Sequence, residues 1–186
     1  VYGKLSVSDA AEMLRNKNGK KETVLGFGNQ KAINQLIAHH SVIFKPAERK
    51  VWVSASPYQL GEFVCYDLNE VFESFPENTG PKEIHNETEN IPADAFLNTS
   101  LYRGYENFRK LKGYIVWFTS HEKFSLPENV LTAFEGSNPY FYHTHELLGD
   151  YHKAHKNIPQ ALKAYEKALS MEIATLGEKE NIEKKR

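Results

Sequence analysis

The feature that most constrains the fold is a predicted β-hairpin that is apolar on both faces. It spans residues 40–54, and a proline-containing turn joins its two strands. Successive side chains point to opposite faces of a strand, so Val42 and Phe44 lie on one face and Ile43 on the other. The second strand repeats this arrangement with Val51, Val53 and Trp52. Strands of this kind are typical of a sheet covered on both sides, which predicts a layered α/β structure or a β-sandwich.

Composition narrows the class of protein. The 186 residues are 40% hydrophobic and 25% charged, which is typical of one medium or two small globular domains and not of a disordered chain. The formal net charge of -1 gives no basic surface for nucleic acid or anionic lipid. No stretch approaches the roughly 20 apolar residues of a membrane span. We therefore expect neither a nucleic-acid partner nor a membrane span.

The single cysteine, Cys65, excludes an internal disulfide. It lies in the apolar run 63–66, where no neighbour along the chain would stabilise a thiolate. We expect Cys65 to pack as a small hydrophobic residue and not to act as a nucleophile.

The chain divides into a strand-rich first part and a helical second part. Residues 76–92 are rich in acids and contain two prolines and a glycine between 76 and 81, which predicts an exposed acidic linker. Apolar residues then recur at helical spacing from 97 to 118 and predict one long helix. Three more helices are expected to begin near Ser125, Asn138 and Pro159, the last with an apolar stripe that extends to Leu176.

The helix pair at about 138–171 resembles one tetratricopeptide repeat. Gly149, Ala161 and Ala168 stand where the two helices of such a repeat touch, with Tyr165 between them. His152 departs from the repeat, which prefers an aromatic residue there. A single repeat cannot bury its own face, so the pair is expected to dock on other parts of the protein. A peptide-binding groove is the alternative.

Four histidines in this region raise the question of a metal site, since imidazoles three or four residues apart on a helix can share one ion. His143 and His145 are two apart and point away from each other. His152 and His155 remain as weak candidates, because no thiolate or second motif accompanies them. We expect surface or groove-lining histidines and no metal.

The segments around the hairpin, 34–46, 51–54 and 60–63, resemble the C-terminal part of the catalytic domain in acyl-coenzyme A:6-aminopenicillanic acid acyltransferase-like proteins, relatives of choloylglycine hydrolase and penicillin acylase. The resemblance covers roughly residues 1–75 and implies an N-terminal-nucleophile fold, with two sheets between helix layers. The expected fold class is therefore α+β. A remnant of an αββα sandwich, with its hairpin at 38–68, precedes an all-helical, tetratricopeptide-like region at 93–186.

The resemblance also implies a mechanism. In that superfamily, self-cleavage exposes a cysteine at a new chain start, and its thiolate attacks an amide or thioester carbonyl with its own α-amino group as base. Val1 cannot fill this role, so we expect the nucleophile upstream and no catalytic residue in this chain. Asn34, His39 and His40 enter a predicted buried strand, where they would face the site or pair with buried backbone groups.

Two functions follow as expectations. The first is the C-terminal fragment of a cysteine N-terminal-nucleophile amidohydrolase or acyltransferase, inactive by itself and without a cofactor. Its partners would be the rest of its own polypeptide and a small-molecule amide or acyl thioester, and we keep a homo-oligomer as an option. A periplasmic or exported location rests on the resemblance alone. The alternative is a non-enzymatic helical module that binds a protein partner.

Overall fold

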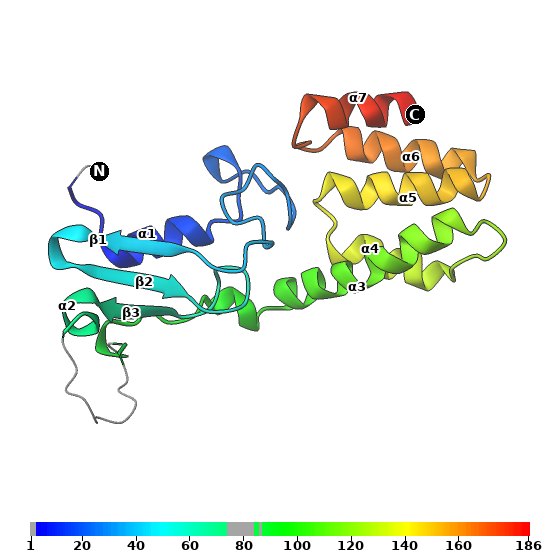
Figure 1. Ribbon diagram of the computed structural model, residues 1–186. Helices are drawn as coiled ribbons and strands as arrows, with labels where there is room; N and C mark the ends of the chain where they lie inside the picture. The colour runs from blue at the N-terminus through cyan, green and yellow to red at the C-terminus, as the bar shows by residue number, and fades with distance from the viewer. Residues whose placement is uncertain (1–2, 74–83, 86) are drawn as a thin grey trace. The chain divides into compact units, whose positions relative to one another are not determined.

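The computed structural model describes residues 3–73, 84–85 and 87–186 (Figure 1). It confirms a mixed α+β fold with a small antiparallel sheet and several helices. The chain forms two compact units that we describe separately. The sheet unit comprises residues 1–16 and 36–97, and the helical unit comprises residues 17–35 and 98–186.

The sheet unit contains three strands in the order β1-β2-β3, all antiparallel. They are β1 (Val42–Lys45), β2 (Lys50–Ser54) and β3 (Phe63–Asp67). The short 3-10 helix η2 (Pro46–Glu48) joins β1 to β2, and its proline sits at the first helical turn, where no backbone donor is needed. Arg49 then adopts a left-handed conformation with φ 54°. The hairpin predicted from the sequence is present, and the third strand contains the apolar run 63–66.

Helix α1 (Val7–Arg15) provides the partner for one face of the sheet. Ser6 caps it in a reciprocal capping box with Asp9, which explains why the helix begins there. Ala11 of the helix is fully buried against a cluster made of Trp52, Phe63 and Cys65. These three residues belong to β2 and β3, so the core of the unit lies between α1 and this covered face of the sheet.

The residues that follow the acidic segment pack along the sheet. Trp52 donates from Nε1 to the carbonyl oxygen of Glu89 at 2.9 Å, and Asn90 accepts from the backbone N–H of Cys65 at 2.9 Å. Ile91 exchanges two backbone hydrogen bonds with Phe63. Of the predicted linker at 76–92, residues 76–83 and 86 lie outside the described residues, and 87–92 belong to the sheet unit.

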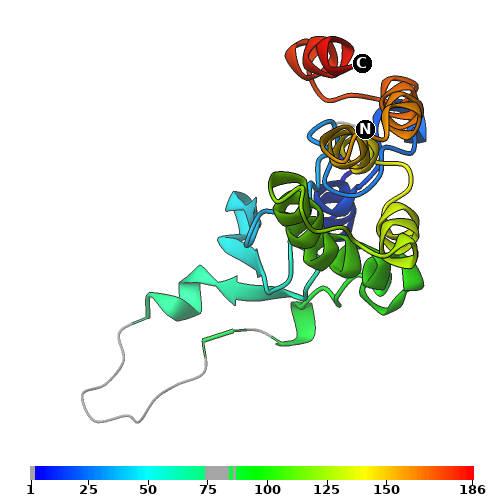
Figure 2. The same cartoon turned by 90° about the vertical axis from the view of Figure 1, so that its right-hand side faces the viewer.

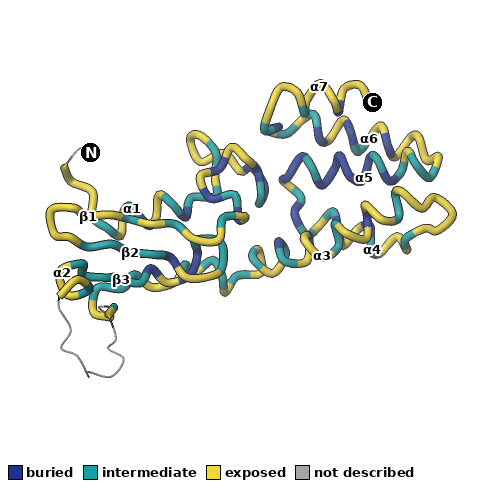
Figure 3. The backbone as a smooth tube through the Cα atoms, in the orientation of Figure 1, coloured by how far each residue is buried: buried dark blue, intermediate teal, exposed yellow. Residues whose placement is uncertain are grey.

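The other face of the sheet is apolar and only partly buried, since Val42 and Phe44 are exposed and the other four side chains are half-buried. Cross-strand pairing aligns its six side chains, which we call the open face: Val42, Val53 and Val64 in one row, Phe44, Val51 and Tyr66 in the next. Phe44 is 68% exposed and Val42 is 38% exposed. Figure 3 shows β1 as mostly exposed. Helix α1 covers one of the two faces that the sequence predicts to be buried, and burial of the other face stays a prediction.

The helical unit is built from antiparallel helices joined by short turns, several of them viewed nearly end-on in Figure 2. Its elements are α3 (Ser100–Ser120), α4 (Glu128–Ser137), α5 (Tyr142–Ala154), α6 (Ile158–Leu169) and α7 (Leu176–Lys185). The long helix and the starts of the next three follow the predicted pattern. The stripe predicted to run to Leu176 is broken, because α6 ends at Leu169 and Thr175 caps a new helix with Glu178. Leu176 is exposed.

Helices α5 and α6 pack at their closest approach through Gly149. A Cβ atom added there would lie 2.4 Å from Cε1 of Tyr165, which is nearer than any real contact allows. Tyr165 is 1% exposed, and its hydroxyl donates to Asp150 at 2.7 Å. Ala161 and Ala168, on the same side of α6, are also buried. The glycine and the two alanines therefore let α6 press its tyrosine against the backbone of α5.

A segment from the first part of the sequence crosses the helical unit. The side chain of Asn138, at the end of α4, accepts from the backbone N–H of Phe27 at 3.0 Å and donates to its carbonyl oxygen at 2.8 Å. Asn29 donates to the carbonyl oxygen of Glu172, between α6 and α7, at 2.9 Å. At Gly26, a Cβ atom would lie 2.4 Å from the backbone nitrogen of Phe141. We call residues 24–34 the strap. The strap packs with the helices, although the resemblance to the catalytic domain covers roughly residues 1–75 and so includes it.

Among the described residues, no helix is both long enough and apolar enough to span a membrane.

The contact at Gly149 makes a prediction about stability. We expect Gly149→Ala to lower the free energy of unfolding by about 1–2 kcal/mol, because overpacking against Tyr165 outweighs the better helix propensity of alanine. Gly136 on α4 has open space around its Cβ position, so Gly136→Ala should raise the same quantity by up to about 1 kcal/mol. Urea denaturation of both variants measures the two effects. Equal and positive shifts would contradict the described packing.

Candidate functional site

The three site-facing candidates of the sequence fall in different units. Asn34 is buried in the strap of the helical unit, at 2% exposed. His39 and His40 are exposed in the sheet unit, just before β1. The three residues remain predictions of a site.

Cys65 occupies the covered face of the sheet and is fully buried. Burial raises the pKa of its thiol, and the carboxylate of Glu89 raises it further, while Lys50 acts in the opposite direction. A thiol that is both buried and harder to ionise is a poor nucleophile. The structure therefore places Cys65 as the packing residue that its apolar neighbours predict.

The histidines of the helical unit use their ring nitrogens in local contacts. His155 directs Nδ1 to the carbonyl oxygen of Tyr151 at 2.8 Å and Nε2 to that of Phe124 at 2.9 Å. His145 is 1% exposed and directs Nε2 to the carbonyl oxygen of Pro139 at 2.8 Å. Burial lowers the pKa of His145 and also that of His152. The described residues contain no group of three His, Cys, Asp or Glu side chains placed to bind a metal ion.

A charged cluster joins α5 to α7. Lys185 donates to Glu146 at 2.7 Å and to Asp150 at 2.8 Å, and His143 lies 2.9 Å from the other carboxylate oxygen of Glu146. Burial would raise the pKa of Glu146, but the hydrogen bonds from His143 and Lys185 outweigh it and lower the pKa to about 2. The cluster is satisfied within the unit, so it stabilises the packing of α7 and leaves no unpaired charge for a ligand.

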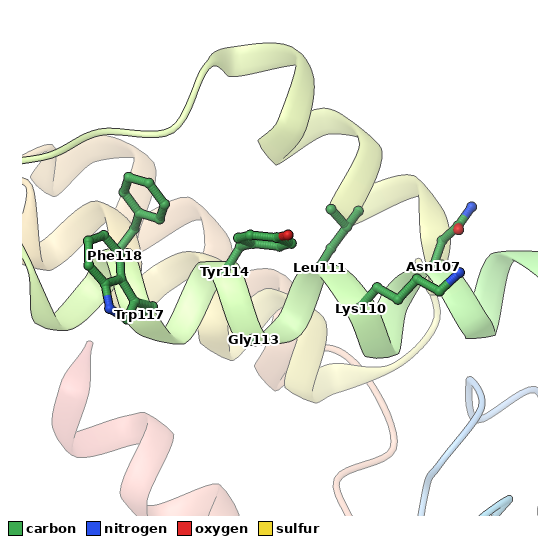
Figure 4. A pocket seen from close by; sticks show the side chains of 7 residues that line it. All are labelled: Asn107, Lys110, Leu111, Gly113, Tyr114, Trp117 and Phe118. Atoms are coloured by element: carbon green, nitrogen blue, oxygen red, sulfur yellow. The ribbon is translucent and has the colours of Figure 1, made fainter.

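The most distinctive surface of the helical unit is an open hollow along α3. It is lined by residues of that helix alone: Asn107, Lys110, Leu111, Gly113, Tyr114, Trp117 and Phe118 (Figure 4). Tyr114 is 58% exposed and Trp117 is 47% exposed, which is unusual for such large side chains on a helix whose other face is buried. The buried face of the same helix carries Tyr105, Phe108 and Ile115. Helix α3 is therefore apolar on both sides.

Aromatic rings gather at the C-terminal end of α3. The ring of Trp117 stacks on that of His121 with centroids 4.1 Å apart and an interplanar angle of 8°. Phe118 and Phe124 lie 4.8 and 6.1 Å from the same indole ring. Phe124, in the turn before α4, is exposed. A rigid, exposed aromatic group of this kind is typical of a surface that binds protein.

Comparison with known proteins adds no relative to these observations. No family model, no curated protein and no solved structure matches this chain. The functional interpretation therefore depends on the two uncovered apolar surfaces, which are the open face of the sheet and the hollow along α3.

Sequence patterns identified the first of these surfaces and missed the second. The alternation of β1 and β2 predicts apolar residues on both sheet faces. On α3, the sequence stripe followed only the buried face. The residues at 110, 114, 117 and 121, spaced four, three and four apart, provide the signal that could have found the second face.

The Glu146 cluster predicts a pH dependence of stability. Since the folded-state pKa of about 2 lies below the ordinary value of 4.5, the stabilisation is present above pH 4.5 and is lost as the pH falls towards 2. We expect Glu146→Gln to be less stable than the native chain at pH 7 and the difference to shrink at acid pH. Glu183→Gln, at an exposed position on α7, should cost little at either pH. Denaturation curves across this range test it, and a difference that stays constant would contradict the cluster.

Proposed function

We propose that this chain is the C-terminal part of a cysteine N-terminal-nucleophile amidohydrolase or acyltransferase, in which the sheet unit completes the catalytic sandwich. The observation that carries the proposal is the open face, whose six apolar residues lie opposite the face that α1 covers. In an αββα sandwich each sheet has a helix layer on one side and the other sheet on its second side. The sheet unit supplies one helix layer and one sheet, and the open face is where the second sheet would pack, about 10 Å away.

The side chains of the open face fit this role. Val42, Val53 and Val64 form one cross-strand row of β-branched residues, and Phe44 and Tyr66 flank Val51 in the other. Such rows are suited to interdigitate with a facing sheet. A strand that remained at the surface of a complete domain would carry polar residues on that side. An exposed apolar sheet face is also a liability for aggregation, which favours a permanent cover.

The reaction proposed for the complete protein is attack of a cysteine thiolate on the carbonyl of an amide or acyl thioester. The nucleophile would come from the part of the protein upstream of this chain, because Cys65 is buried in the covered face. Its α-amino group would accept the thiol proton, and the acyl group would pass to water or to an amine. The present chain would contribute structure around that site and not the reacting atoms.

A second candidate function belongs to the helical unit. We propose that α5 and α6 form a tetratricopeptide-like pair within a helical interaction module. The close approach of Gly149 to Tyr165, flanked by buried Ala161 and Ala168, supports the pair. The exposed hollow along α3 supports the interaction role, because Tyr114 and Trp117 are large aromatic side chains that remain about half exposed.

The enzyme proposal predicts that this chain is inactive by itself. Purified and incubated with acyl amides or acyl thioesters, it should give no more product than its Cys65→Ala variant, since the buried thiol of Cys65 is a poor nucleophile. Product formation is followed by mass spectrometry over a range of pH values. Turnover that depends on Cys65 would overturn the assignment of the nucleophile to an upstream segment.

The open face provides a second prediction. In the longer protein, we expect Phe44→Asp to abolish amide hydrolysis, because the charge would be buried between the two sheets. In the isolated chain the same change should alter stability by no more than about 0.5 kcal/mol, since Phe44 is exposed there. Met13→Asp, at an exposed position on α1, is the matched control and should leave the activity intact.

The two proposals can be separated by the same assay. If the Phe44→Asp variant of the longer protein hydrolyses amides as fast as the native protein, the sandwich proposal is wrong. Trp117→Ala in the longer protein should retain hydrolysis and lose association with a protein partner. If Trp117→Ala changes neither property, the interaction role of the helical unit is refuted while the enzyme proposal stands.

A further inference from the structure

The outward face of α3 carries a regular stripe of residues. Positions 103, 110, 114, 117 and 121 lie within one side of the helix, and Gly113 lies at its edge. We call these six residues the α3 stripe: Arg103, Lys110, Gly113, Tyr114, Trp117 and His121. Without Gly113, the residues of the stripe are spaced seven, four, three and four apart, which follows the period of a helix that packs on another helix. The core of the unit lies on the opposite side, at Tyr105, Phe108 and Ile115.

The chemistry of the stripe differs between its two halves. The N-terminal half contains the cations Arg103 and Lys110, and the C-terminal half contains the rings of Trp117 and His121. Cations and aromatic faces attract each other, with tryptophan the strongest partner. The stripe is therefore complementary to a copy of itself that runs in the opposite direction. A copy running in the same direction would place cations beside cations.

From this geometry we propose that the chain forms a two-fold symmetric dimer in which the α3 stripes of two copies pack antiparallel. The inference rests on the interaction function proposed for the helical unit, and it names the partner as a second copy of this chain. The two-fold axis would pass between Gly113 and Tyr114. Lys110 and Trp117 are equally distant from that point, so the Lys110 of each copy lies over the Trp117 indole of the other.

The residues at the axis suit the arrangement. A residue close to a two-fold axis meets its own copy, so the two Gly113 residues face each other on one side and the two Tyr114 rings on the other. A Cβ atom at Gly113 would have no neighbour within 4 Å in the chain, so packing within the unit does not explain a glycine that costs about 1 kcal/mol in a helix. A second helix crossing at this point does, because glycine lets the two backbones approach closely.

The size of the stripe sets the expected strength of the dimer. The surface area that one helix face can bury is smaller than the roughly 800 Å² per partner of a standard protein interface. We therefore expect a dissociation constant in the micromolar range and not the nanomolar range. The exposed aromatic residues should provide most of the binding energy, as Trp and Tyr do at other interfaces.

Sedimentation equilibrium of the whole chain measures the dimer directly. We expect a monomer–dimer equilibrium with micromolar affinity, and Trp117→Ala should weaken it at least about tenfold. The side chain of Trp117 is half exposed, so the variant should keep the circular dichroism spectrum of the native chain. A native chain that remains monomeric up to about 1 mM would overturn the proposal.

Cysteine cross-linking tests the position of the axis. Under mild oxidation Gly113→Cys should form a disulfide-linked dimer, since the two positions face each other across the axis. Gly136→Cys is the matched control, because Gly136 is also an exposed helical glycine with open space at its Cβ position, and it should not cross-link. The native chain controls for Cys65, which is buried.

The outcomes separate the dimer from the function on which it rests. Equal cross-linking at 113 and 136, or a dimer that Trp117→Ala leaves unchanged, would show that α3 is not the interface. A monomeric chain whose longer form still loses another protein partner in the Trp117→Ala variant would refute the dimer and leave the interaction function standing.

Discussion

The main physical constraint on the sheet unit is that both faces of its small sheet are apolar and are stabilised by burial. Helix α1 buries the face that contains Trp52, Phe63 and Cys65, and Arg15 at its end holds the helix in place by donating to the carbonyl oxygens of Gly61 and Pro92. The same helix cannot reach the other side. We propose that the six residues of the open face pack against a second sheet.

The helical unit buries its apolar residues by packing helices and the strap against one another. Tyr165 fills the gap at Gly149, and Asn138 pairs with both backbone groups of Phe27, so that α5, α6 and the strap share one core. Helix α3 carries the large exposed rings of Tyr114 and Trp117 outside this core. Both units therefore present an apolar surface next to a well-packed core, one on a sheet and one on a helix. We propose a second sheet as the cover for the branched rows of the open face and an antiparallel helix as the cover for the α3 stripe.

Much of this organisation could be predicted from the sequence because it depends on local periodicity. The two strands of the hairpin and the starts of the helices near Ser125 and Pro159 are determined by residues close together in the chain. The position of the strap could not be predicted, because the bonds between Asn138 and Phe27 join residues far apart in sequence. Periodicity likewise identifies which residues are apolar but not which face an element covers, so the exposure of Phe44 became visible only in three dimensions.

We propose that a second sheet covers the open face in the longer protein. The most direct measurement is the rate at which a maleimide labels Phe44→Cys in the isolated chain and in the longer protein, with Cys65→Ala in both. If a sheet covers the face, labelling should be fast in the isolated chain and slower by at least about a hundredfold in the longer protein, as expected for a residue that reacts only after local opening. Equal labelling rates in the isolated chain and the longer protein would show that no second sheet covers the open face.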